Sequence, residues 1–387
     1  NTFKELRDFD DDGYKVELDR WVDILEKKFR KFIVDKKIDF IVPQNVWCVA
    51  ANPAVGVALE NVRREFDIPA LAHNHDFFWE RSGGVALTSA AAIEMAQKYL
   101  PPRDAKIKHA VINSLAQNQL WERKGISSTV VPNIFDFDAP AWEKDEYNAD
   151  FRERIGLKEN DILILQATRI VARKGIELAI DFVKALDTPK RRAQLKEKGL
   201  YDRRSFDDDS RIVFVLAGYA RDDMAGTYLP SLKEKAARDG VDMIHIEDLV
   251  HHGRQFENGE KTYSLWDTYV FSDFVTYPSL WEGWGNQFLE ALRAKLPVML
   301  FEYPVYKEDI GTKGFQVVSL GAKVQDYDQA GLAQVQVQIM ERAADEAVIF
   351  LTDAQAREDA VEHNFQLGQK YYSMNALRDH LGKLMSN

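Results

Sequence analysis

Apolar residues recur at intervals of three and four near the start of the chain. The positions that follow this spacing are Leu18, Trp21, Val22, Leu25, Phe29, Phe32 and Ile33. Because an α-helix has 3.6 residues per turn, they share one face, and the pattern predicts a long amphipathic helix. A short strand-like run, IDFIVPQN, follows, and further strand-like and helical runs alternate up to about residue 133. Strands that alternate with helices indicate a parallel, doubly wound sheet.

Residues 134–150 interrupt this alternation. They are acidic, include Pro140 and show no regular period, so we interpret them as a linker between two domains. A second alternation follows, with clear strand-like runs in DILILQAT, RIVFVLAG and FVTYPS. The charged stretch 188–210 predicts a surface excursion. The tail from Thr352 onward predicts two helices with a break near residues 371–373.

Composition narrows the possible classes of protein. The chain has 387 residues, is 45% hydrophobic and carries a net charge of −11, which favours a globular protein and disfavours a nucleic-acid binder. Cys48 is its only cysteine, so no intramolecular disulfide can form, and a reducing, cytoplasmic compartment is expected. No apolar run approaches the length of a membrane span.

The segment from Tyr277 to Leu300 carries the clearest chemical signal. Glu282 lies in a predicted loop with Gly283 and Gly285, and Glu290 lies one turn into a helix that begins near Asn286. A helix N-terminus attracts phosphate, and glycines let a ligand approach the backbone. Carboxylates on either side can accept hydrogen bonds from hydroxyls. Phosphate flanked by two polyols describes a nucleotide sugar, although two solvated glutamates on an ordinary loop and helix would leave the same pattern.

This segment resembles the glutamate–seven residues–glutamate signature of retaining glycosyltransferases with the GT-B fold, family 4, also called glycosyl transferases group 1. The resemblance runs from about Asp39 to the end of the chain. It includes VVPNIFDF, in which Ile134 replaces a usual glycine, and the closing helix YYSMNALRDHL. It implies two Rossmann-like, doubly wound parallel-sheet domains that face each other across a cleft.

The resemblance also assigns a part to each section of the chain. Residues 1–140 would form the acceptor-side domain, residues 150–350 the nucleotide-sugar-binding domain, and residues 351–387 helices that cross back to the first domain. Family members usually open with a strand and a Gly-Gly loop. Nothing similar precedes the first helix here, since Gly83 and Gly84 lie downstream. The N-terminal domain is therefore expected to be truncated at its start.

The stretch ATRIVARKGIELAI resembles the family's G-R-x-x-x-x-K-G element, with Thr168 in the glycine position. The resemblance implies that Arg169 and Lys174 bind the diphosphate, where cations stabilise the charge that develops on the leaving group. Arg173 is expected to face solvent. A solvated basic turn is the alternative. The implied donor-binding residues are Arg169, Lys174, Glu282, Gly283, Trp284, Gly285, Asn286 and Glu290, with Glu290 on the ribose hydroxyls and Glu282 on the donor sugar.

His75 lies six residues after Pro69, as a histidine does in the family's P-x-V-x-T-x-H strand. The resemblance implies that His75 contacts the donor sugar and the reacting centre, with His73 as the competing choice. The implied catalytic residues are thus His75, Glu282, Arg169 and Lys174. His73, His75 and Asp76 could instead bind a metal, but no further ligand cluster is evident. We expect no metal and no cofactor beyond the nucleotide-sugar substrate.

The predicted function is that of a retaining hexosyltransferase. Its donor would be a GDP-, UDP- or ADP-sugar, and its acceptor a soluble small molecule or carbohydrate. A sugar phosphorylase on the same fold, or a non-catalytic nucleotide-sugar-binding subunit, would show many of the same features. No nucleic-acid partner and no membrane span are expected.

Overall fold

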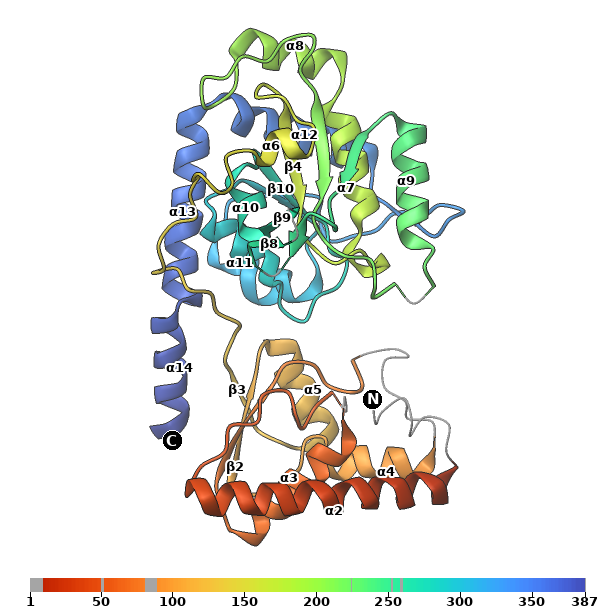
Figure 1. Cartoon of the computed structure of the whole chain (residues 1–387), viewed down its shortest axis with the longest axis vertical. Helices are drawn as coiled ribbons and strands as arrows, with labels where there is room; N and C mark the ends of the chain where they lie inside the picture. The colour runs from red at the N-terminus through yellow and green to blue at the C-terminus, as the bar shows by residue number, and fades with distance from the viewer. Residues whose placement is uncertain are drawn as a thin grey trace. The chain divides into compact units, whose positions relative to one another are not determined.

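The computed structural model describes residues 10–49, 52–80, 89–223, 225–251, 253–257 and 260–386. The chain divides into two compact units, shown in Figure 1. Unit 1 comprises residues 1–133 and 377–387, and unit 2 comprises residues 134–376. The segment 134–150, which we expected to be a linker, thus belongs to unit 2.

Unit 1 is built on a parallel sheet with the strand order β1-β2-β3. Its elements are α2 (Asp11–Lys36), α3 (Pro53–Glu65), β1 (Ala70–Asn74), α4 (Ala90–Tyr99), β2 (Ile107–Val111), α5 (Ser114–Lys124), β3 (Thr129–Val130) and most of α14 (Met374–Ser386). The predicted amphipathic helix is confirmed as α2, whose Asp10 cap accepts a hydrogen bond from Gly13 N at 2.8 Å. Gly83 and Gly84 lie outside the described residues.

The expected strand IDFIVPQN is not a regular strand. Only Ile41 and Gln44 form bridges, both parallel to β1. The Pro43 carbonyl accepts a hydrogen bond from His73 N at 3.0 Å, and Asn45 N donates to the His73 carbonyl at 2.9 Å. Proline has no N–H to donate to the Leu71 carbonyl, so Pro43 interrupts the ladder between the bond from Leu71 N to the Ile41 carbonyl and the bond from His73 N to the Pro43 carbonyl. The segment still lies along the edge of β1.

Unit 2 holds a sheet of six parallel strands in the order β12-β11-β10-β4-β5-β6. The strands are β4 (Ile162–Gln166), β5 (Ile212–Leu216), β6 (Asp242–His245), β10 (Phe274–Tyr277), β11 (Val298–Leu300) and β12 (Val318–Ser319). The chain proceeds outward from β4 to β6 and then outward again from β10 to β12. The point where the strand order reverses therefore lies between β4 and β10. Ligands of doubly wound sheets bind beyond the carboxyl ends of the strands at this switch point.

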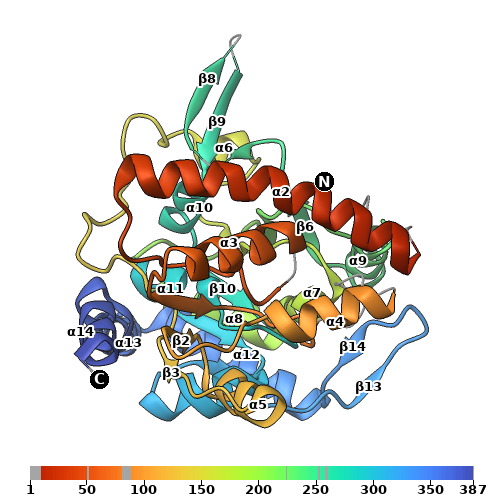
Figure 2. The same ribbon diagram turned by 90° about the horizontal axis from the view of Figure 1, so that it is seen from below.

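Helices and hairpins complete unit 2. The helices are α6 (Phe151–Arg154), α7 (Ile176–Leu186), α8 (Pro189–Lys198), α9 (Tyr228–Asp239), α10 (Leu265–Val270), α11 (Asn286–Arg293), α12 (Val337–Thr352) and α13 (Ala354–Tyr372). The additional strands are β7 (Val250–His251), β8 (Gln255–Glu257), β9 (Glu260–Ser264), β13 (Asp326–Tyr327) and β14 (Ala333–Gln334). Figure 2 shows the hairpins β8–β9 and β13–β14, each antiparallel. The predicted break in the tail is confirmed at Ser373, between α13 and α14.

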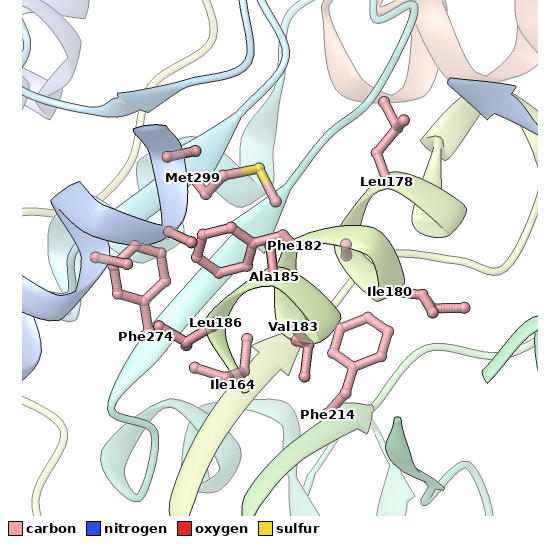
Figure 3. Close-up of a cluster of buried hydrophobic side chains, with 14 of the residues drawn as sticks. Ile164, Leu178, Ile180, Phe182, Val183, Ala185, Leu186, Phe214, Phe274 and Met299 are labelled. Carbon is pink, nitrogen blue, oxygen red and sulfur yellow. The ribbon is translucent and has the colours of Figure 1, made fainter. Parts of the chain in front are cut away.

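The main core of unit 2 lies between α7 and the sheet. In Figure 3, Phe182 of α7 lies beside Phe274 of β10, and Val183 lies beside Phe214 of β5. The charged stretch 188–210 lies mostly at the surface, as expected, but it also contributes apolar side chains to this core. Leu195 is fully buried, because α8 turns this apolar side chain inward and most of its charged ones outward, and Phe206 in the loop after α8 is almost fully buried as well.

The segment 134–150 packs onto unit 2 through aromatic side chains. Trp142 stacks on Trp266 with ring centroids 4.4 Å apart, and Phe135 N donates to the Tyr372 carbonyl at 2.8 Å. Arg293 of α11 donates to the carbonyls of Asp136 and Pro140. These contacts fix the segment against α10, α13 and α11, the last of which follows the glutamate-bearing loop.

Candidate functional site

Two loops meet at the switch point of the unit 2 sheet. Residues 167–175 follow β4 and include the short 3-10 helix η1 (Ala172–Lys174), and residues 278–285 follow β10. Leu280 N donates to the Arg173 carbonyl at 2.9 Å, which joins the two loops through their backbones. A Cβ atom on Gly175 would lie 2.4 Å from the Pro278 carbonyl oxygen, so only glycine permits this approach. The two sequence motifs are therefore held side by side.

The carboxylate of Glu282 is paired with two cations of the other loop. Lys174 Nζ donates to Glu282 Oε1, and Arg173 Nη1 donates to Glu282 Oε2 at 2.9 Å. The side chains of Lys174 and Glu282 are only 10% and 9% exposed. Burial by itself raises the pKa of Glu282, but the two cations outweigh that effect and hold its pKa below the usual value. Glu282 is therefore ionised at neutral pH.

Arg173 was expected to face solvent, and the structure corrects this. Its guanidinium also donates to the Trp281 carbonyl at 3.1 Å and lies over the Trp281 ring, 5.7 Å from the centroid. The side chain is 34% exposed. Arg173 is drawn inward by the buried carboxylate of Glu282, which lies 109 residues later in the sequence. The residues around Arg173 give no sign of this partner.

The helix α11 begins at Asn286, as predicted, directly after Gly285. Gly285 has a φ of +120°, and a Cβ atom there would lie 2.2 Å from the hydroxyl oxygen of Tyr303. That hydroxyl donates to the Trp284 carbonyl at 2.7 Å. Because the N-cap is a glycine, it supplies no capping side chain, and this N-terminus presents the positive end of the helix dipole. The arrangement can receive a phosphate.

Glu290 lies one turn into α11 and is partly exposed. Its Oε2 atom accepts a hydrogen bond from the buried hydroxyl of Tyr269 at 2.7 Å. Burial raises the pKa of Glu290, and the Tyr269 hydrogen bond acts in the opposite direction. Tyr269 fixes one carboxyl oxygen, so the group can accept hydroxyl hydrogen bonds through the other.

Arg169 is placed differently from Lys174. Its guanidinium forms an ion pair with Asp222, in the loop that follows β5, and 44% of the side chain is exposed. Within the described part of unit 2, Arg169, Arg173 and Lys174 are thus each paired with a carboxylate of the chain itself. A diphosphate that binds to Arg169 has to compete with Asp222.

A chain of buried polar side chains connects the two loops beneath the site. Gln166 Nε2 donates to Thr168 Oγ1 at 2.7 Å, and Thr276 Oγ1 donates to Gln166 Oε1 at the same distance. Gln287 of α11 donates to the Thr276 carbonyl at 3.4 Å. Sequence reasoning placed Thr168 in the family's glycine position but missed Gln166, Thr276 and Gln287. Their signal is a polar residue near the end of an otherwise apolar strand, in ILILQ and FVTY.

His75 lies in unit 1, one residue beyond the end of β1. Its ring is 4.6 Å from that of His73, and its Nε2 atom lies 3.3 Å from Gln44 Oε1. His73 donates from Nε2 to the Val131 carbonyl at 3.1 Å. Burial and the neighbouring His73 lower the pKa of His75 to about 4, so its imidazole is neutral at pH 7. The His73 ring is thus tied to the sheet. The His75 ring contacts the side-chain amide of Gln44, and its backbone N–H donates to Asn45 Oδ1 at 3.0 Å.

His73, His75 and Asp76 were the alternative candidates for metal ligands. Among the residues that the structure describes, no three His, Cys, Asp or Glu side chains gather as a metal site would require. Metal independence stays a prediction, because it concerns the reaction and not the arrangement of these side chains alone.

The chain is similar to known proteins along most of its length. Residues 148–333 match the model of the family Glycosyl transferases group 1. The mannosylglucosylglycerate synthase of Petrotoga mobilis is 36% identical over 380 residues, which cover 97% of this chain and 84% of that protein. The chain belongs to the group 1 glycosyltransferases. The synthase of the same name from Thermotoga maritima is also 36% identical to this glycosyltransferase, over 92% of the chain and 82% of its own length.

Solved structures of low sequence identity share the fold of this glycosyltransferase. Anabaena HepE, solved in complex with UDP and glucose, has a TM-score of 0.58 at 14% identity and covers 96% of this chain and 81% of its own. A UDP-forming trehalose-phosphate synthase from Burkholderia xenovorans has a TM-score of 0.59 at 13% identity, with 97% and 79% covered. The predicted GT-B fold class is confirmed. In the described residues, no helix is both long and apolar enough to span a membrane.

Proposed function

We propose that the protein is a retaining glycosyltransferase of family 4 that transfers a mannosyl group from a nucleotide sugar to glucosylglycerate. The observation that carries this proposal is the 36% identity to two mannosylglucosylglycerate synthases over 97% and 92% of the chain. The product in their name combines a mannosyl unit with a glucosylglycerate unit. A nucleotide-mannose is therefore the proposed donor, and glucosylglycerate, a small anion, is the proposed acceptor.

The geometry of unit 2 supports a donor with a diphosphate. Lys174 contacts Glu282 of the loop that leads into α11, Arg169 lies in the same loop as Lys174, and Glu290 offers a carboxyl oxygen for ribose hydroxyls. Glu282, ionised and buried, is suited to accept hydrogen bonds from the transferred sugar. These roles, together with the catalytic role of His75, follow the family resemblance.

The proposed step breaks the bond between C1 of mannose and the diphosphate oxygen and forms a bond from C1 to an acceptor hydroxyl oxygen. The acceptor attacks the face that the diphosphate leaves, so the anomeric configuration is retained. Its proton passes to a phosphate oxygen of the leaving nucleoside diphosphate. Cations at the diphosphate stabilise this transition state more than the ground state, because negative charge grows there as the bond breaks.

The test is an assay with GDP-mannose, UDP-mannose and ADP-mannose, each with glucosylglycerate as the acceptor. Mass spectrometry is expected to detect mannosylglucosylglycerate with one of these donors, and NMR is expected to show the α-configuration of the donor in the product. A β-linked product would refute retention. Turnover of mannose 1-phosphate in place of every nucleotide-mannose would identify a phosphorylase. Binding of a nucleoside diphosphate without transfer from any donor would identify a binding subunit.

The two glutamates are expected to differ in what they recognise. Glu290→Ala should weaken binding of the bare nucleoside diphosphate, because the ribose loses its carboxyl partner. Glu282→Ala should mainly weaken the complete nucleotide-mannose, and each loss should be roughly tenfold or more for a charged hydrogen bond. Calorimetry with both ligands measures the difference. Equal losses for both ligands in both variants would contradict these roles.

A further inference from the structure

Glu282 pairs with two neighbouring cations, Arg173 and Lys174, in the loop that follows β4. Its Oε1 atom accepts from Lys174, and its Oε2 atom accepts from Arg173 at 2.9 Å. The residue is 7% exposed, so water provides little of its solvation. A buried carboxylate that loses its partners is strongly destabilised or takes up a proton.

Under the proposed function, on which this inference rests, a diphosphate binds Lys174. The ammonium group is a single point charge on a flexible stem, so it turns away from Glu282 as it engages phosphate. Glu282 then keeps Arg173 as the charged partner of its other oxygen. Arg173 is fixed in place there, by its bond to the Trp281 carbonyl at 3.1 Å and by its ring contact with Trp281.

We propose that Arg173 is a positioning residue that keeps Glu282 ionised and oriented when Lys174 moves to the diphosphate. Arg173 acts through Glu282 and does not itself bind phosphate. The backbone supports the same role, because the Arg173 carbonyl accepts from Leu280 N at 2.9 Å and so ties the arginine to the glutamate loop. Tyr277 and Tyr303 also interact with Glu282, and they stay protonated because burial raises their pKa.

The proposal is tested with a double-mutant cycle. Binding of GDP, UDP and ADP is measured by calorimetry for the wild type, Arg173→Gln, Glu282→Gln and the double variant. Arg173→Gln should weaken binding of the preferred nucleoside diphosphate by roughly tenfold to a hundredfold, because binding now leaves Glu282 without a charged partner. The affinity of the double variant should lie within about threefold of that of Glu282→Gln, since the double variant has no Glu282 carboxylate that needs a charged partner.

Proton uptake supplies a second measurement. In the Arg173→Gln variant, Glu282 should take up a proton when the diphosphate binds, and calorimetry in buffers of different ionisation enthalpy detects it. The wild type should show no such uptake at pH 7.5. Arg173→Lys should recover part of the affinity, because it restores the charge without the planar fork. Arg342→Gln removes one charge from an exposed position on α12 and should change nothing.

Three results would overturn the proposal. If Arg173→Gln weakens binding equally with and without Glu282, then Arg173 is a direct phosphate ligand. If Arg173→Gln binds as tightly as the wild type, Arg173 has no such role. The third measurement uses the ligand-free protein. Carbon-13 NMR should show a higher pKa for Glu282 in the Arg173→Gln variant than in the wild type. An unchanged pKa refutes the proposal even if no nucleoside diphosphate binds, in which case the proposed function has failed separately.

Discussion

At the scale of single residues, adding one methyl group or removing one charge at the site should change stability or binding of the nucleoside diphosphate. Gly285 adopts a φ of +120° directly beneath the hydroxyl of Tyr303. Asp222 and Glu282 neutralise the cations that we expect to bind diphosphate. Each of these positions yields a prediction that does not depend on the identity of the nucleotide base.

Gly285→Ala should destabilise the protein by about 1–3 kcal/mol, because the new methyl group meets Tyr303 and the backbone leaves its preferred region. Loss of donor binding should accompany it, since the N-terminus of α11 must shift. Thermal unfolding and calorimetry measure the two effects. Gly253→Ala is the control, because a Cβ atom there has no neighbour within 4 Å. Equal behaviour of the two variants would show that the Tyr303 contact imposes no constraint.

Asp222→Asn should strengthen binding of the nucleoside diphosphate. The Arg169–Asp222 pair is substantially exposed, and such pairs contribute about 0–1 kcal/mol, so a gain of up to roughly fivefold is expected. The gain should shrink at high salt. Calorimetry at two salt concentrations measures it, with Asp187→Asn, in the surface pair with Arg192, as the control. A loss of affinity would mean that Asp222 orients Arg169 toward the ligand and does not compete with it.

At the scale of elements, the start of α7 is fixed by a buried hydrogen-bond network next to Lys174. The Tyr228 hydroxyl accepts from Ile176 N at 2.8 Å and donates to Glu177. Glu177 in turn accepts from Ala333 N at 2.8 Å, which connects α7 with the hairpin β13–β14. Burial raises the pKa of Glu177. The network thus holds together α7, α9 and the hairpin.

Tyr228→Phe should lower the free energy of unfolding by roughly 1–3 kcal/mol, because the buried N–H of Ile176 and one oxygen of the buried Glu177 carboxyl group lose their bond to the Tyr228 hydroxyl. Urea unfolding followed by tryptophan fluorescence measures the change. The matched control is Tyr99→Phe, whose hydroxyl makes a single long hydrogen bond of 3.4 Å to Asn61. A similar, small effect of both substitutions would contradict the role of the network.

At the scale of the whole molecule, the chain forms two units, and unit 1 responds to acid through a buried histidine. His109 of β2 lies in the core of unit 1 and is 4% exposed. Burial lowers its pKa to about 4, and the positive charge of Lys124 acts in the same direction. The folded protein therefore keeps His109 neutral to lower pH than the unfolded chain does.

Between pH 6.5 and 4, the unfolded state binds the proton first, so His109 makes stability fall as the pH falls. The wild type should lose on the order of 3 kcal/mol of its free energy of unfolding across this range because of His109, and His109→Gln should abolish that loss. Urea unfolding of the wild type and the variant at pH 7, 5.5 and 4 measures it. Parallel stability curves for the two proteins would rule out this contribution.

The sequence by itself determined the succession of elements and the segment that carries the chemistry. Apolar periodicity located α2, α7 and the strands β4, β5 and β10, because period and burial are local properties of a chain. The spacing of Glu282 and Glu290 around two glycines located the loop and the helix that follows it. Local rules failed where a single residue breaks them, as Pro43 does in the expected first strand.

Only the tertiary structure decided which residues meet. The strand order brings the loop after β4 beside the loop after β10, and it thereby pairs Arg173 with a carboxylate 109 residues away. The inward packing of α8 and the contact between Gly285 and Tyr303 have the same origin. The periodicity of a segment indicates that one of its faces is buried. It does not indicate which element covers that face, because this depends on how distant strands are ordered in the sheet.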